Sequence, residues 1–189
     1  MVGVGNWGIN HVKTLTSLNH YVGCVDRNHK KLLKVKSLFP GITCFTNIED
    51  SLKDNFDGYI ISTPPSSHAQ LAKKIISNSK PILVEKPLCL SIKESEEIKS
   101  YLKKYNGKLM VGHLMLFHPA VLKINEIISR GEIGNIQYIY SNRLNLGKVR
   151  KEENVFWSFA PHDISLFQFF SKSFPSDISS LGGYFLQKN

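Results

Sequence analysis

The sequence has few cysteines. Its 189 residues include only three, an odd number without Cys-x-x-Cys spacing. Two of them, Cys24 and Cys44, lie in apolar stretches typical of strands, and the third is Cys89. This pattern is typical of buried free thiols, so we expect no disulfide framework and no metal site.

Signals for membrane insertion and export are also lacking. No stretch approaches about eighteen consecutive apolar residues, and the N-terminus has no basic segment followed by a long apolar run. We therefore expect no spanning helix, no signal peptide, no membrane partner and a cytoplasmic location. Internal repeats, low-complexity tracts and long linkers are absent as well.

Acidic residues are scarce relative to basic ones. There are 15 Asp and Glu against 24 Lys and Arg, which gives a formal charge of +9. The lysines are spread over helix-like segments such as 30–36 and 99–104, which favours solvated helix faces over a nucleic-acid site. Their combined field can still raise the local concentration of an anionic ligand, such as a dinucleotide or a nucleotide sugar.

What the sequence does contain is an alternation of β-branched runs and amphipathic segments. With 42% hydrophobic residues, the length suits one full domain and a fragment of another. The expected strands are 2–4, 21–26, 42–45, 59–62, 82–85 and 109–112, and the expected helices between them are 8–18, 29–39, 66–78 and 92–105. This βαβα order predicts an α/β fold: a Rossmann doubly wound parallel sheet with helices on both faces.

The pattern changes after residue 112. A helix at 119–129 leads into a long strand-like run at 136–145, which is too extended for another short Rossmann strand. A helix at 161–170 and a second strand at 178–186 follow. We therefore predict a dinucleotide-binding domain at 1–115 and a partial α+β substrate domain at 116–189, with the boundary near 113–118.

The glycine-rich segment from Gly3 to Gly8 fits G-x-G-x-x-G and lies between a short strand and a helix. Gly3 permits the tight turn, Gly5 lets the backbone approach a pyrophosphate, and Gly8 allows the helix to pack on the strand. Asn6 and Trp7 complete the turn. A glycine turn that binds nothing has the same local pattern, so the prediction of a dinucleotide site depends on the context, the residues around the motif.

That context is Asp26, which ends the next strand about twenty residues further on. Its carboxylate can accept hydrogen bonds from both ribose hydroxyls of the adenosine half, and it disfavours a 2′-phosphate. NAD is therefore the preferred cofactor. Arg27 beside it can tolerate a phosphate, which leaves NADP as the alternative.

Two further strand ends carry polar residues. The strand at 59–62 ends in Ser62, Thr63 and Pro64, and His68 follows. Since ligands bind at the carboxyl edge of an open α/β sheet, these residues are expected beside the dinucleotide, although a simple capped loop explains them too. The strand at 82–85 brings Glu85 and Lys86 to the same edge, where an ammonium can hold a substrate or stabilise an alkoxide. A surface lysine is the alternative.

In order and spacing these motifs resemble the glucose-fructose oxidoreductase and inositol dehydrogenase (Gfo/Idh/MocA) family over nearly the whole chain. They comprise the glycine turn, Asp26, Thr63-Pro64 with His68, Glu85-Lys86-Pro87, Gly112-His113, Phe117-His118-Pro119 and Ala160-Pro161-His162-Asp163. Glu-Lys-Pro is the most specific element. Residues 157–164 look like the branch that acts on nucleotide-linked or amino sugars.

The resemblance implies hydride transfer between NAD and a carbon bearing a sugar hydroxyl. Lys86 would contact cofactor and substrate, Glu85 would orient Lys86, and His162 would be the acid/base with Asp163 tuning it. Arg143 and Asn145, on the expected strand at 136–145, would contact substrate phosphate or hydroxyls. The substrate domain would also provide a homo-oligomer interface.

Three features depart from the family pattern. The first strand is short, Ser158 stands four residues before His162 where relatives often carry Asp, and the sequence stops at Asn189, soon after the second strand of the substrate domain. Two functions stay open: an active NAD-dependent sugar dehydrogenase, or a truncated relative that binds dinucleotide without turnover. The third hypothesis, a basic module for nucleic acid, is disfavoured by the spread of the lysines.

Overall fold

The computed structural model describes residues 1–144 and 154–183. It forms two compact units. The first contains Met1–Leu114 and the described residues between 143 and 161, and the second contains Met115–Asn142 and the described chain from His162. The predicted division at residue 115 stays a prediction.

The first unit is built on short parallel strands. They are β1 (Gly23–Val25), β2 (Thr43–Phe45), β3 (Tyr59–Ile61), β4 (Ile82–Val84) and β5 (Leu109–Val111). β1 pairs with β2, and β3 pairs with β4, which pairs with β5. Val2 joins the two groups because it forms parallel bridges to Val25 and Ile61. The spatial order is therefore β2, β1, Val2, β3, β4, β5, the order of a Rossmann sheet, as predicted.

Helices alternate with these strands. They are α1 (Gly8–Ser17), α2 (His29–Leu38), α3 (Ile48–Lys53), α4 (His68–Ser77) and α5 (Ile92–Lys104), with a 3₁₀ turn, η1 (Pro65–Ser67), before α4. The sequence analysis did not predict α3. Its Asn47 cap accepts from the backbone N–H of Asp50, and this signal was available in the sequence.

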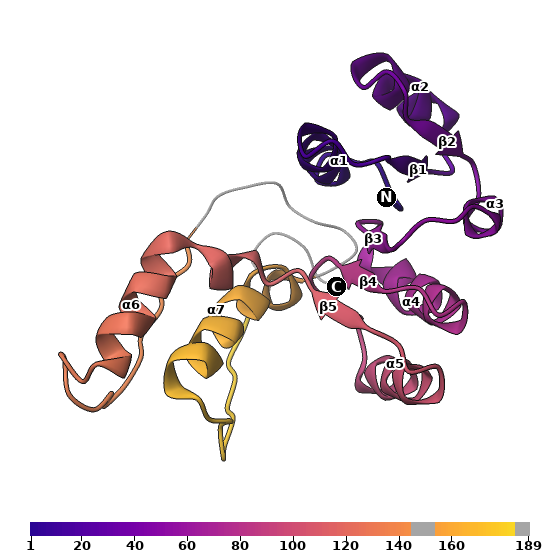
Figure 1. The fold of residues 1–189 in the computed structure, drawn as a ribbon. Coiled ribbons are helices and arrows are strands. Elements are labelled where there is room, and N and C mark those ends of the chain that lie inside the picture. Colours follow the sequence, from indigo (N-terminus) through magenta and orange to yellow (C-terminus); the bar gives the residue numbers. More distant parts are fainter. Residues whose placement is uncertain (145–153, 184–189) are drawn as a thin grey trace. The chain divides into compact units, whose positions relative to one another are not determined.

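The core lies in two clusters on opposite faces of the sheet. One contains Val12 of α1 with Leu32 and Val35 of α2. The other contains Ile75 and Ile76 of α4 with Ile98 of α5, among others. Figure 1 shows α1 and α2 on one side of the strands and α4 and α5 on the other, as a doubly wound fold requires.

The predicted first strand was too long. Only Val2 of residues 2–4 bridges its neighbours, because Gly3 adopts a φ of 86° and turns the chain out of the extended conformation. The other five predicted strands and the four predicted helices of this unit are confirmed, and each of their ends lies within two residues of the prediction.

The second unit contains α6 (Pro119–Ser129), whose bounds equal the prediction, and the carboxyl part of α7 (Val155–Ser171). A 3₁₀ turn, η2 (Leu114–Phe117), precedes α6. The helix predicted to begin at residue 161 in fact begins at Val155, and Pro161 lies inside it. The prediction placed the helix start at Pro161 because proline is favoured in the first turn of a helix.

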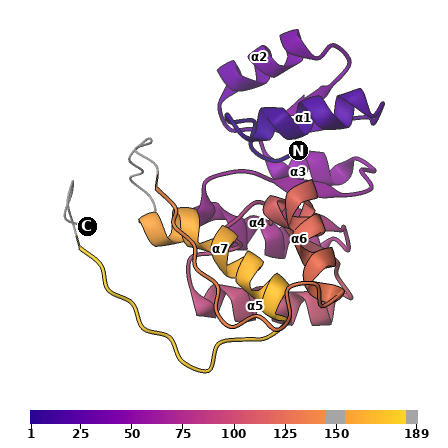
Figure 2. The ribbon, with the colours of Figure 1, turned by 90° about the vertical axis from the view of Figure 1, so that its left-hand side faces the viewer.

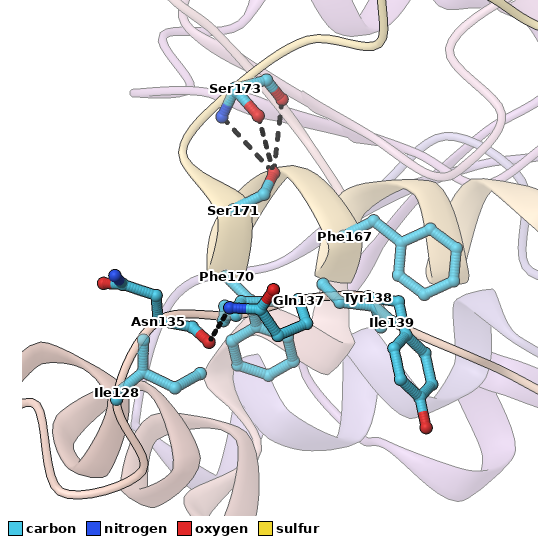
Figure 3. Close-up of a pocket in the computed structure, with 11 residues that line it drawn as sticks. Ile128, Asn135, Gln137, Tyr138, Ile139, Phe167, Phe170, Ser171 and Ser173 are labelled. Atoms are coloured by element: carbon cyan, nitrogen blue, oxygen red, sulfur yellow. Dashed lines mark hydrogen bonds between the residues drawn. The ribbon is translucent and has the colours of Figure 1, made fainter.

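The prediction of two strands in the substrate domain is wrong for the described residues. Residues 136–144 and 178–183 contain neither strand nor helix and are mostly exposed. Figure 2 shows 172–183 as an extended trace. An isolated strand gains no stability without a partner, and the described residues of this unit supply none. The second unit does form a cavity of about 620 Å³ between α6, the chain at 134–139 and α7 (Figure 3).

Candidate functional site

All strands of the first unit run in parallel, so their carboxyl ends meet at one edge of the sheet. This edge carries the glycine turn after Val2, Asp26 after β1, the 62–64 loop after β3 and Glu85 and Lys86 after β4. The sequence analysis predicted these four segments as one site, and the topology brings them to the same edge.

The glycine turn is shaped by contacts that only glycine allows. A Cβ on Gly3 would lie 2.8 Å from Thr63 Cγ2, and a Cβ on Gly8 would lie 2.0 Å from the carbonyl oxygen of Gly3. A Cβ on Gly5 would meet nothing within 4 Å. Gly3 and Gly8 are therefore required by packing, whereas Gly5 leaves open space beside the start of α1.

That open space fits an anionic group. Trp7 caps α1 without a side-chain hydrogen bond to the helix, and no acidic residue lies in the first turn. The N-terminal N–H groups of a helix attract negative charge, and neither a capping side chain nor a carboxylate competes for them here. The residues present thus fit the pyrophosphate of a dinucleotide.

Asp26 is held in a defined orientation by the backbone. The N–H of Val4 donates to its Oδ2 at 3.0 Å, and the N–H of Asn28 donates to its Oδ1 at 2.8 Å. Lys31 Nζ lies 3.9 Å from Oδ2, and the Asp26 side chain is 11% exposed. One carboxylate therefore links the glycine turn to the end of β1. Arg27 beside it is exposed.

Glu85 is buried and accepts hydrogen bonds from α1. Trp7 Nε1 donates to Glu85 Oε1 at 2.7 Å, and His11 Nε2 lies 2.7 Å from the same oxygen. Burial by itself raises the pKa of this carboxyl group, but the hydrogen bonds from His11 and Trp7 and the backbone N–H of Lys86 outweigh it, so the pKa lies below its usual range. Glu85 is therefore an ionised acceptor at neutral pH.

Lys86 leaves β4 at the same edge. Its Nζ donates to the backbone carbonyl of Ser158 at 2.9 Å. Ser158 is 5% exposed. It lies in the amino-terminal part of α7, which belongs to the first unit. Position 158, where the sequence departs from the family pattern, thus contacts Lys86 through its backbone carbonyl. Any residue type at this position would provide that carbonyl.

His68 is buried between two loops. Its Nδ1 lies 2.8 Å from the carbonyl oxygen of Pro87, and its Nε2 lies 2.8 Å from that of Thr63. The ring is 1% exposed. It therefore joins the loop after β3 to the loop after Lys86, whereas Pro64 and Asn6 are exposed at the edge.

The remaining predicted residues lie elsewhere in the chain. His162 and Asp163 are half-buried residues of α7 in the second unit, where Ser141 Oγ donates to Asp163 Oδ1 at 2.8 Å. Arg143 is exposed, and Asn145 lies outside the described residues. Lys86 belongs to the first unit and His162 to the second.

Three residues at the edge escaped the sequence analysis as site residues. They are His11, Gly112 and His113. His11 follows Trp7 by four residues, so the two share a helix face, a signal that could have identified the pair. A Cβ on Gly112 would lie 3.1 Å from Glu85 Oε2, and burial lowers the pKa of His113, which favours its neutral form.

The fold and this edge define a dinucleotide-binding Rossmann domain. Residues 1–113 match the oxidoreductase family with an NAD-binding Rossmann fold, Gfo/Idh/MocA. The chain belongs to this family, and its first unit is the NAD(P)-binding part, as the sequence resemblance indicated.

Curated relatives include sugar and inositol dehydrogenases. The chain is 24% identical to the UDP-N-acetylglucosamine 3-dehydrogenase of Acidithiobacillus ferrooxidans, over 96% of this chain and 56% of that protein. It is 39% identical to the scyllo-inositol 2-dehydrogenase (NAD(+)) of Bacillus subtilis, over 43% of this chain and 24% of that protein. The chain therefore spans about half or less of the length of these two relatives.

Solved structures share the fold. The scyllo-inositol dehydrogenase of Lactobacillus casei, determined with NAD(H) and scyllo-inositol, superimposes with a TM-score of 0.76 at 18% identity. The match covers 90% of this chain and 55% of that one. Among the described residues, no helix has the length and apolar character needed to cross a membrane.

Proposed function

We propose that this protein is an NAD-dependent oxidoreductase that transfers a hydride to or from a carbon bearing a sugar hydroxyl. The observation that carries the proposal is the carboxyl edge, where an open glycine turn, a fixed Asp26 and Lys86 meet. Bound NAD supplies the hydride acceptor or donor at its nicotinamide ring. The residues of the chain bind it and handle the substrate proton.

NAD is preferred over NADP at this edge. The two backbone N–H groups hold the Asp26 carboxylate in place, so a 2′-phosphate would meet a fixed negative charge. Hydroxyl groups of the ribose would instead donate to it. Lys31, at 3.9 Å, and the exposed Arg27 reduce this repulsion without removing it.

Lys86 and His162 are the proposed catalytic residues. The Lys86 ammonium donates hydrogen bonds and stabilises negative charge on a substrate oxygen. The His162 imidazole exchanges the hydroxyl proton, since its ordinary pKa lies near neutral pH. Arg143, Asn145 and Asp163 are the proposed substrate contacts. A nucleotide-linked or amino sugar is the proposed substrate class, in line with the activity named for the Acidithiobacillus relative.

A second candidate is a protein that binds dinucleotide without turnover. The observation that favours it is the second unit, whose described residues form helices and irregular chain but no sheet. Positioning a sugar against the nicotinamide requires a wall that excludes water. A longer protein that contains this chain could supply that wall.

The two candidates are separated by a hydride-transfer assay. The purified protein is incubated with NAD and a panel of UDP-hexoses, amino sugars and inositols, and NADH formation is followed by absorbance. Formation that depends on one substrate class and disappears in Lys86→Ala supports the dehydrogenase. A protein that binds NADH and reduces no NAD with any member supports the second candidate.

A further inference from the structure

Trp7, His11 and Glu85 form a cluster that the proposed reaction does not use directly. Both ring nitrogens lie 2.7 Å from one oxygen, Glu85 Oε1. An ionised carboxylate only accepts, so Trp7 Nε1 and His11 Nε2 both donate to it. Charge-assisted bonds of this kind are the stronger ones in proteins.

The cluster fixes Trp7, a residue of the glycine turn that is too exposed to be held by packing alone. Trp7 is 48% exposed, and the His11 side chain is 25% exposed, whereas Glu85 is 8% exposed. Trp7 is the N-cap of α1, His11 lies in its first turn, and Glu85 directly follows β4. Their hydrogen bonds therefore fix the exposed end of α1 to the strand that presents Lys86.

The carboxylate itself has little freedom to move. Its Oε2 faces Gly112, where a Cβ would lie at 3.1 Å, and the N–H of Gly112 donates to the carbonyl of Val84 at 2.8 Å. The backbone N–H of Glu85 donates to the carbonyl of Ile61 at 2.9 Å. Glu85 is thus anchored to β3 and packed against the end of β5 while it holds α1.

We propose that Glu85 is a positioning residue that sets NAD affinity through Trp7 and His11, by holding the first turn of α1 in register with Lys86. This inference rests on the proposed NAD site. The physical reason is preorganisation: a helix N-terminus that is already fixed loses less conformational freedom when it binds a pyrophosphate. The role differs from direct contact with the cofactor and from orientation of the Lys86 side chain.

The test uses the whole chain with Trp157→Phe, so that Trp7 is the only tryptophan. Glu85→Gln keeps a neutral acceptor, Glu85→Ala removes it, and His11→Ala removes one donor while the carboxylate stays. Glu97→Gln is the matched control, because Glu97 is also a carboxylate that accepts from a side chain of another helix, Lys73 of α4, and it takes no part in this cluster. NADH affinity is measured by calorimetry, acrylamide quenching of Trp7 is measured without nucleotide, and thermal unfolding reports the fold.

We expect Glu85→Ala to weaken NADH binding by about tenfold or more, as the loss of hydrogen bonds to a charged group predicts. Glu85→Gln and His11→Ala should weaken it less. Each should increase the quenching of Trp7, and Glu97→Gln should change neither quantity. If Glu85→Ala does not fold, the ordering of Glu85→Gln and His11→Ala against the control carries the test.

Three results would overturn the inference, and each does so in a different way. Unchanged NADH affinity in folded Glu85 and His11 variants, with the parent protein binding NADH, rejects the positioning role alone. Weaker binding with unchanged quenching of Trp7 also rejects it, because Glu85 would then act on the cofactor directly. A parent protein that binds no NADH rejects both this inference and the proposed function.

Discussion

In the proposed function, single residues at the carboxyl edge divide into those that bind the cofactor and those that act on the substrate. Asp26 belongs to the first group, since its carboxylate is fixed at the end of β1. Asp26→Ala should weaken NADH binding by roughly 1 to 3 kcal/mol, the loss typical of charged hydrogen bonds. Calorimetric titration of the variant measures this, and an unchanged Kd would show that another residue recognises the ribose.

Lys86 is proposed for the second group, the residues that act on the substrate. Lys86→Ala should abolish turnover while leaving NADH affinity within about tenfold, because the proposed cofactor contacts lie mainly at the glycine turn and Asp26. The measurement pairs initial rates with a binding titration. Full activity of the variant would exclude a catalytic role for this lysine.

Glu85 also makes stability depend on pH. Its pKa in the folded protein lies below the usual range despite burial, because hydrogen bonds from His11 and Trp7 favour the ionised form. The stabilisation is therefore complete above the pKa of an unfolded Glu and is lost as the pH falls through the lower folded value. Urea unfolding at several pH values should show a difference between the parent protein and Glu85→Gln that is largest near neutrality and shrinks in acid. A difference independent of pH would contradict this assignment.

At the scale of elements, the glycine turn offers a direct comparison of packing and ligand access. Gly3 has a φ of +86°, and its Cβ would lie 2.8 Å from Thr63, whereas Gly5 faces open space. Gly41 has a φ of +95° with nothing within 4 Å, so Gly41→Ala reports the strain of the backbone alone. Gly3→Ala should destabilise the protein more than Gly41→Ala does.

Gly5→Ala should instead leave stability nearly unchanged and weaken NADH binding, because the new methyl group enters the space proposed for the pyrophosphate. Thermal unfolding and calorimetric titration of these variants distinguish the two effects. Equal NADH affinity of Gly5→Ala and the parent protein would place the pyrophosphate elsewhere.

These elements also show how far the sequence predicts the structure. Short β-branched runs separated by amphipathic segments gave the Rossmann order, because the alternation follows from burial on both faces of a parallel sheet. The pairing of His11 with Glu85 needed the three-dimensional arrangement, since 74 residues separate them. The strand predicted at 136–145 failed in its described part because a strand-like run becomes a strand only beside a partner.

At the scale of the whole first unit, buried thiols report cooperative unfolding. Cys24 is fully buried in β1, and burial raises its pKa to about 11, which suppresses the reactive thiolate. In a protein with Cys44→Ser and Cys89→Ser, the labelling of Cys24 should follow global unfolding and accelerate with urea. Rapid labelling independent of urea would indicate that β1 opens locally.

The chain as a whole belongs to a family of NAD-binding oxidoreductases, and the proposed function requires that the chain bind NAD at the carboxyl edge. The most direct test is a titration of the purified protein with NADH and then NADPH, following energy transfer from tryptophan to the bound nicotinamide. We predict saturable binding with a clear preference for NADH, and weaker NADH binding by Asp26→Ala. A folded protein that binds neither nucleotide, or that prefers NADPH, would contradict this prediction.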